Sequence, residues 1–121
     1  MKLENIKKKS LKELQDLGKK SEETIQKEII NYCKLNNLLI FCVPNEATRN
    51  NSKFIGMGVL SGVSDLVLIL ENRIIFVELK NHKGLQSENQ KQFESRVLEL
   101  GHQYVIIRSL EDFKKLICNC E

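Results

Sequence analysis

Two short apolar segments separated by a polar triplet constrain the fold of this chain most. Residues 66–70 read LVLIL, residues 74–79 read IIFVEL, and Glu71, Asn72 and Arg73 stand between them. Short runs rich in branched apolar residues on either side of polar turn residues are typical of a β-hairpin. We therefore predict two antiparallel strands, over 66–70 and 74–79, with the turn at Glu71-Asn72-Arg73.

Charged residues stand at one end of this predicted hairpin. Asp65 precedes the first strand, Glu78 lies near the end of the second, and Lys80 follows it. Side chains alternate between the two faces of a strand, so Glu78 and Lys80 point to the same face. The start of the first strand lies beside the end of the second in an antiparallel pair. We therefore expect Asp65, Glu78 and Lys80 to converge.

Such a group is suited to metal-assisted hydrolysis of a phosphate ester. The carboxylates of Asp65 and Glu78 and the backbone carbonyl of Leu79 offer only oxygen ligands, which Mg²⁺ and Mn²⁺ prefer. A bound ion lowers the pKa of a bound water and neutralises charge on a phosphoryl oxygen, while Lys80 orients or deprotonates that water.

The alternative is that the glutamate and lysine form a solvated surface ion pair and that Asp65 is a turn residue after Gly62. We favour the functional interpretation for Asp65, Glu78 and Lys80 together, and for none of them singly.

The order of these motifs resembles a known nuclease superfamily. The pattern consists of Gly62-Val63-Ser64-Asp65, an apolar strand, Glu78-Leu79-Lys80, and a helix that opens near Gln90. It resembles the PD-(D/E)XK superfamily, and within it the VRR-NUC branch of virus-type replication-repair nucleases, from about residue 21 to residue 116. Ser64 stands where the superfamily has proline, as in many members of this branch. The resemblance implies a restriction-endonuclease-like αβββαβ core.

Periodicity and capping residues predict the remaining elements. Residues 1–20 form a basic amphipathic helix with an apolar stripe, and further helices follow Ser21, Ser87 and Ser109. Strands are expected over 39–43 and 103–108, and a long polar connection over 44–64. We predict an α/β fold in which a mixed four-stranded sheet has helices on both faces, with an extra helix at each end of the core and a nuclease-like domain over 21–121. The stripe consists of Leu3, Ile6, Leu14 and Leu17, with Leu11 at its margin.

The resemblance adds two supporting residues to the site. Glu22 is expected to support the metal, in preference to Glu23, because it shares a helical stripe with Ile25 and Ile29; the alternative is that it only favours the helix dipole. Gln90 is expected to point into the site. Its amide could instead complete a capping box with Ser87, and we take the two roles to exclude each other.

Charge and the resemblance together suggest nucleic acid as the partner. The chain has 19 basic and 16 acidic residues, a net charge of +3, and residues 1–34 hold the whole excess. A mildly basic surface fits nucleic acid without requiring it. The cations expected to contact phosphates, which could also be merely solvated, are Lys83, Lys91, Arg108, Arg49 and Lys53.

The four cysteines fit neither a disulfide framework nor a metal site. Cys33 and Cys42 are expected to be small apolar fillers in a helix and a strand, and Cys118 and Cys120 to lie in a fraying tail. A zinc site is the lesser alternative. No apolar run approaches the roughly 20 residues of a membrane span, and the N-terminus lacks the apolar region of a secretion signal. We therefore expect a cytoplasmic protein, and the resemblance implies a bacterium or a phage-infected cell as its setting.

The predicted function is that of a metal-dependent endonuclease acting on DNA. By analogy with small members of the family, it would select branched DNA such as a four-way junction or a flap. Cutting both strands requires two sites, so we expect a homodimer. The alternatives are a catalytically silent nucleic-acid-binding protein and the nuclease subunit of a larger complex with a further protein partner.

Overall fold

A computed structural model describes residues 20–43 and 51–120 of the chain. The described helices are α2 (Glu22–Leu35), α4 (Ser52–Gly56), α5 (Glu88–Glu99) and α6 (Leu110–Cys120), and the strands are β1 (Leu39–Cys42), β2 (Leu66–Leu70), β3 (Arg73–Leu79) and β4 (Gln103–Ile107). This order confirms the predicted αβββαβ core and the extra helix at its C-terminal end. The helix expected over 1–20 lies outside the described residues. None of the described helices has the length and apolar character needed to cross a membrane.

The four strands form one mixed sheet in the order β1-β2-β3-β4. The β1–β2 and β2–β3 pairs are antiparallel, whereas β3 and β4, which α5 connects, are parallel. The turn between β2 and β3 is shorter than predicted, because Leu70 pairs with Arg73 and only Glu71 and Asn72 remain in it. Asn72 adopts a φ of 65°, in the left-handed region that asparagine tolerates better than most residues.

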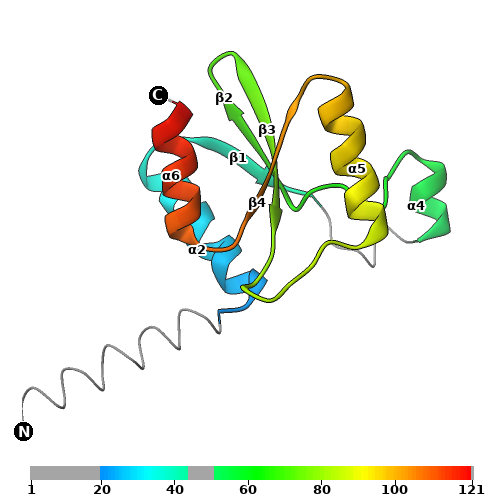
Figure 1. Ribbon diagram of the computed structural model, residues 1–121, viewed down its shortest axis with the longest axis horizontal. Coiled ribbons are helices and arrows are strands. Elements are labelled where there is room, and N and C mark those ends of the chain that lie inside the picture. The colour runs from blue at the N-terminus through cyan, green and yellow to red at the C-terminus, as the bar shows by residue number, and fades with distance from the viewer. Residues whose placement is uncertain (1–19, 44–50, 121) are drawn as a thin grey trace, which may run out of the picture.

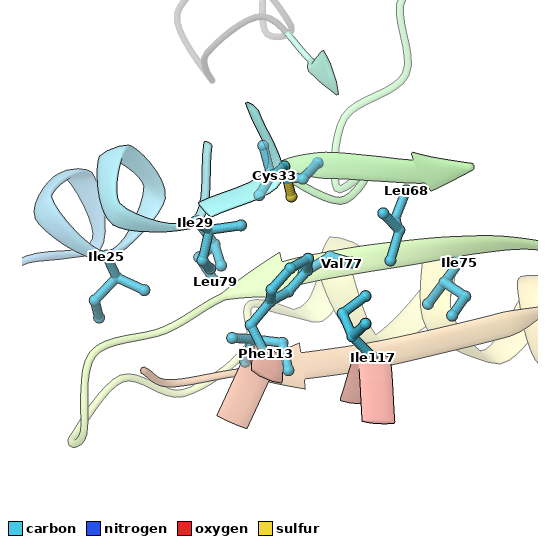
Figure 2. Packing of buried hydrophobic residues seen from close by; sticks show 11 residues of the cluster. Ile25, Ile29, Cys33, Leu68, Ile75, Val77, Leu79, Phe113 and Ile117 are labelled. Carbon is cyan, nitrogen blue, oxygen red and sulfur yellow. The ribbon is translucent and has the colours of Figure 1, made fainter. Parts of the chain in front are cut away.

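One face of the sheet forms the apolar core against α2 and α6. Leu66 pairs with Val77 and Leu68 with Ile75, so these four side chains share that face. Figure 2 shows residues from both strands packed against residues of the two helices, and Figure 1 shows α5 on the opposite side of the sheet. Helices on both faces are thereby confirmed. The helical contributors to the core are Ile25, Ile29 and Cys33 of α2 and Phe113 and Ile117 of α6.

Aromatic contacts fix α5 over the opposite face. The ring of Phe93 lies edge-on to Phe76 of β3, with 5.4 Å between centroids, and to Tyr104 of β4, with 6.0 Å. Such pairs contribute stabilisation beyond the area they bury. They hold α5 over β3 and β4, with its first turn at the end of the sheet where β3 finishes.

Three local predictions need correction. The connection over 44–64 is not entirely irregular, because α4 begins after Asn51, whose side chain accepts the Lys53 N–H. Cys42 is exposed rather than a filler, since it ends the edge strand β1. Cys118 and Cys120 do not lie in a frayed tail, because α6 is anchored by its buried residues and continues through Cys120.

Cys33 behaves as predicted. Its side chain is fully buried on α2, and burial raises the pKa of its thiol to about 11, so it stays protonated near neutral pH and acts as a small apolar group. All four cysteines are free.

Candidate functional site

Glu78 and Lys80 form a buried ion pair at the end of β3. Their side chains are 1% and 10% exposed, and Lys80 Nζ lies 3.6 Å from Glu78 Oε1. Burying two charges carries a large desolvation penalty, which only close pairing and further hydrogen bonds offset. This pair is therefore not the solvated surface contact that was the alternative interpretation of the sequence.

Gln90 supplies the further hydrogen bond and also caps α5. Its Nε2 donates to Glu78 Oε1 at 2.8 Å, while its Oε1 accepts the Ser87 N–H at 2.9 Å. Ser87 Oγ in turn accepts the Gln90 N–H at 3.2 Å, which completes the capping box. The prediction that the two roles exclude each other is wrong, because an amide has a donor at one end and an acceptor at the other.

Asp65 is held where the ends of three strands meet. Its Oδ2 accepts the Leu79 N–H at 2.8 Å, and its backbone carbonyl accepts the Val43 N–H at 2.8 Å. Leu66, the next residue, pairs with Val77, so Asp65 lies beside the end of β3 that carries Glu78. The fold thus places all three residues of the predicted group at one end of the sheet.

A cavity of about 410 Å³ opens between this end of the sheet and the start of α2. Asp65 and Leu79 line it together with Glu22, Glu23, Gln26 and Lys27. Glu23 is occupied by an exposed ion pair with Lys27, with 3.0 Å between Glu23 Oε1 and Lys27 Nζ, whereas Glu22 is partly buried. This position agrees with the preference for Glu22, although its role stays a prediction.

The carboxylates of this region do not form a complete metal cage. Within residues 20–43 and 51–120, no group of three or more His, Cys, Asp or Glu side chains is placed to hold a metal ion. An ion beside Asp65 and Glu78 would therefore need backbone carbonyl, water or substrate oxygens as well, which is how Mg²⁺ is usually bound in proteins.

The predicted phosphate contacts fall into different environments. Arg108 donates from Nη1 to the carbonyls of Asn81 and Gly84, at 2.8 and 2.9 Å, so it fastens the loop that follows Lys80. Lys53 and Lys83 are exposed. Lys91 is also exposed and lies 3.5 Å from Glu88 Oε1. Arg49 lies outside the described residues.

Sequence reasoning missed a polar cluster beside the site. Gln86 Nε2 donates to the Tyr104 hydroxyl at 3.2 Å and to Glu94 Oε1 at 3.3 Å. Burial raises the pKa of Tyr104 strongly, the Gln86 bond opposes this, and the negative charges of Glu78, Glu94 and Asp65 add to the rise. The pairing of β3 with β4 could have indicated that Tyr104 lies near the site. Ile106 is the partner of Glu78, and Tyr104, two residues earlier in β4, has its side chain on the same face.

Comparison with known proteins supports the fold. No protein-family model matches the sequence, and no curated protein matches it. A solved structure described as "VRR_NUC domain protein" matches with a TM-score of 0.68 and 21% identity, over 81% of this chain and 85% of that one. The chain has the VRR-NUC fold. The predicted resemblance is therefore confirmed at the level of the fold.

A close backbone approach fastens the segment before Asp65 to α5. Gly62 is buried with a φ of 86°, and a Cβ at this position would collide with the backbone carbonyl of Asn89. Asn89 Nδ2 also donates to Ser61 Oγ at 3.1 Å. Because Asn89 precedes Gln90, this contact ties the approach to Asp65 to the helical turn that holds Glu78.

We expect Gly62→Ala to destabilise the protein more than Gly58→Ala. Gly58 also has a positive φ, 100°, but nothing lies near its missing Cβ, so it reports the backbone strain alone. The collision at Gly62 should add about 1–3 kcal/mol to the loss of unfolding free energy. Urea unfolding of both variants measures the difference, and equal losses would show that the contact with Asn89 does not matter.

Proposed function

We propose that this chain is a metal-dependent nuclease that hydrolyses phosphodiester bonds in DNA. The buried contact between Glu78, Lys80 and Gln90, beside Asp65, carries the proposal. A surface that only binds DNA gains nothing from carboxylates, which repel phosphate, whereas hydrolysis uses them. The VRR-NUC fold supports the same conclusion by analogy.

The residues present fit Mg²⁺ or Mn²⁺. The groups available around Asp65 and Glu78 are carboxylate and carbonyl oxygens, and no cysteine or histidine lines the adjoining cavity, so the chemistry suits a hard cation rather than zinc. Asp65, Glu78 and the Leu79 carbonyl would hold the ion, with Glu22 in support. When bound, such an ion stabilises charge on the phosphoryl group and lowers the pKa of water.

The protein's own groups have separate roles in this proposal. Lys80 orients the attacking water and stabilises negative charge that develops on the phosphate, because its ammonium is held at the ion pair with Glu78. Gln90 holds the carboxylate of Glu78 in one orientation. Asp65 is held by its bond to the Leu79 N–H, so both carboxylates keep their positions before substrate arrives.

The proposal extends to the substrate, the oligomeric state and the residues that contact DNA. Branched DNA such as a four-way junction or a flap is the substrate, and a homodimer provides the second site needed to cut both strands. Lys53, Lys83, Lys91 and Arg49 contact phosphates, while Arg108 contributes mainly by fastening the loop after Lys80. The proposal includes a cytoplasmic location, and the nuclease subunit of a larger complex with a further protein partner is the alternative. Retained DNA binding without cleavage by the protein with Mg²⁺ or Mn²⁺ would favour the silent nucleic-acid-binding alternative.

We expect Lys80→Met to slow cleavage by about 10²-fold or more while DNA binding is nearly unchanged. The matched control is Lys83→Met, which removes an exposed lysine three residues away and should weaken binding more than turnover. Single-turnover cleavage of labelled DNA with Mg²⁺, together with binding in chelator, separates the two effects. Equal losses of binding and turnover in Lys80→Met would mean that Lys80 is only a phosphate contact.

We expect Asp65→Asn to abolish cleavage and to reduce the rise in melting temperature that Mg²⁺ produces in the parent. The asparagine oxygen can still accept the Leu79 N–H, so the metal-free variant should stay within about 1 kcal/mol of the parent. Asp112→Asn is the control, because Asp112 also accepts a backbone N–H, that of Arg108 at 3.3 Å, but does not line the cavity that Asp65 lines. Paired thermal melts decide the matter, and an unaltered Mg²⁺ response in Asp65→Asn would contradict the proposed ligand.

A further inference from the structure

The loop between β3 and α5 presents an apolar side chain beside the proposed site. Leu85 is 83% exposed, and His82 and Lys83, earlier in the same loop, are also exposed. Figure 1 shows this loop at the end of the sheet where β3 finishes, on its way to the start of α5. Single exposed leucines are common on protein surfaces and need no explanation by themselves. The way in which this leucine is held is what distinguishes it.

Hydrogen bonds fasten the loop on both sides of Leu85. On the N-terminal side, Arg108 donates to the carbonyls of Asn81 and Gly84, and the Gly84 N–H donates to the Asn81 carbonyl at 3.1 Å. On the C-terminal side, Gln86 donates to the Tyr104 hydroxyl and to Glu94. Leu85 therefore lies between two anchored residues. Gly84 is held by Arg108, and Gln86 is bonded to Tyr104 of β4 and to Glu94 of α5.

The same loop is in contact with Lys80. A Cβ at Gly84 would lie 3.2 Å from Lys80 Cδ, so the backbone of Gly84 packs directly against the lysine side chain. The residue that precedes Leu85 is thereby held against Lys80. An exposed apolar group beside an exposed lysine, both close to a hydrolytic site, matches the chemistry of a nucleic acid, which has apolar base faces next to phosphates.

We propose that Leu85 is a wedge that enters the base stack of DNA at a branch or unpaired position, with Lys83 on the adjoining phosphate. The inference rests on the proposed nuclease function and assigns part of its substrate selectivity to this residue. Separating stacked bases is unfavourable, and least so where pairing is already interrupted. A wedge next to Lys80 would therefore direct cleavage to branched DNA over continuous duplex.

The test compares Leu85→Ala with Leu35→Ala in the full chain. Leu35 is 86% exposed and ends α2, so it controls for the loss of a solvent-exposed leucine. Binding is measured in chelator to a four-way junction and to a linear duplex of the same sequence, with 2-aminopurine at the branch point. We expect the parent to prefer the junction and to raise the fluorescence of the probe. Leu85→Ala should reduce that preference by about 10-fold and remove the fluorescence rise, whereas Leu35→Ala should change neither.

Three results of the binding test would overturn the wedge. They are an unchanged junction preference in Leu85→Ala, an equal loss of affinity for both DNAs, and a parent that does not alter the probe. A dimer in the parent that dissociates in Leu85→Ala, seen by sedimentation, would also overturn it by assigning the residue to a protein contact. If no DNA is cut with Mg²⁺ or Mn²⁺ but the Leu85-dependent preference persists, the wedge is supported and the nuclease function alone fails.

Discussion

The side-chain amide of Gln90 joins helix α5 to the strand that carries the candidate site. One end of the amide accepts a hydrogen bond within the helix cap, and the other donates to Glu78. A carboxylate buried to this extent must be hydrogen-bonded and paired with a cation to be tolerated. Gln90 and Lys80 meet both needs at the same oxygen atom. The position of α5 therefore determines whether the Glu78 carboxylate keeps its hydrogen bond from Gln90.

Side chains along β3 and at the residue after it alternate between the apolar core and the candidate site. Val77 and Leu79 enter the apolar core with α2 and α6, whereas Glu78 and Lys80 face the side covered by α5. A shift of one residue in the register of β3 would exchange these two sets and bury charges in the core. The alternation that builds the core thus also specifies where the charged groups lie, and the bond from Leu79 N–H to Asp65 brings in the second carboxylate.

Local patterns predicted the elements because they depend on near neighbours. Ser21 and Ser87 cap α2 and α5 as expected, and the apolar runs form the central hairpin. A prediction failed where exposure decides the outcome, as at Cys42 on the edge strand. Side-chain contacts between residues distant in the chain could not be predicted from local patterns. Arg108 fastens a loop more than twenty residues earlier in the chain, which no local pattern reveals. Gln90 satisfies two partners because tertiary packing brings Glu78 to the same amide that caps α5, whereas the sequence prediction took the two roles to exclude each other.

The central claim is that Asp65 and Glu78 together hold a divalent ion. The most direct measurement is a titration with Mn²⁺, in which electron paramagnetic resonance reports the free ion, for the parent, Asp65→Asn and Glu78→Gln. Glu23→Gln serves as control, because that carboxylate lies on the same cavity but is paired with Lys27 at the surface. We expect the two site variants to bind Mn²⁺ at least about 10-fold more weakly than the parent, and the control to match it. Equal binding by all four proteins would contradict the account.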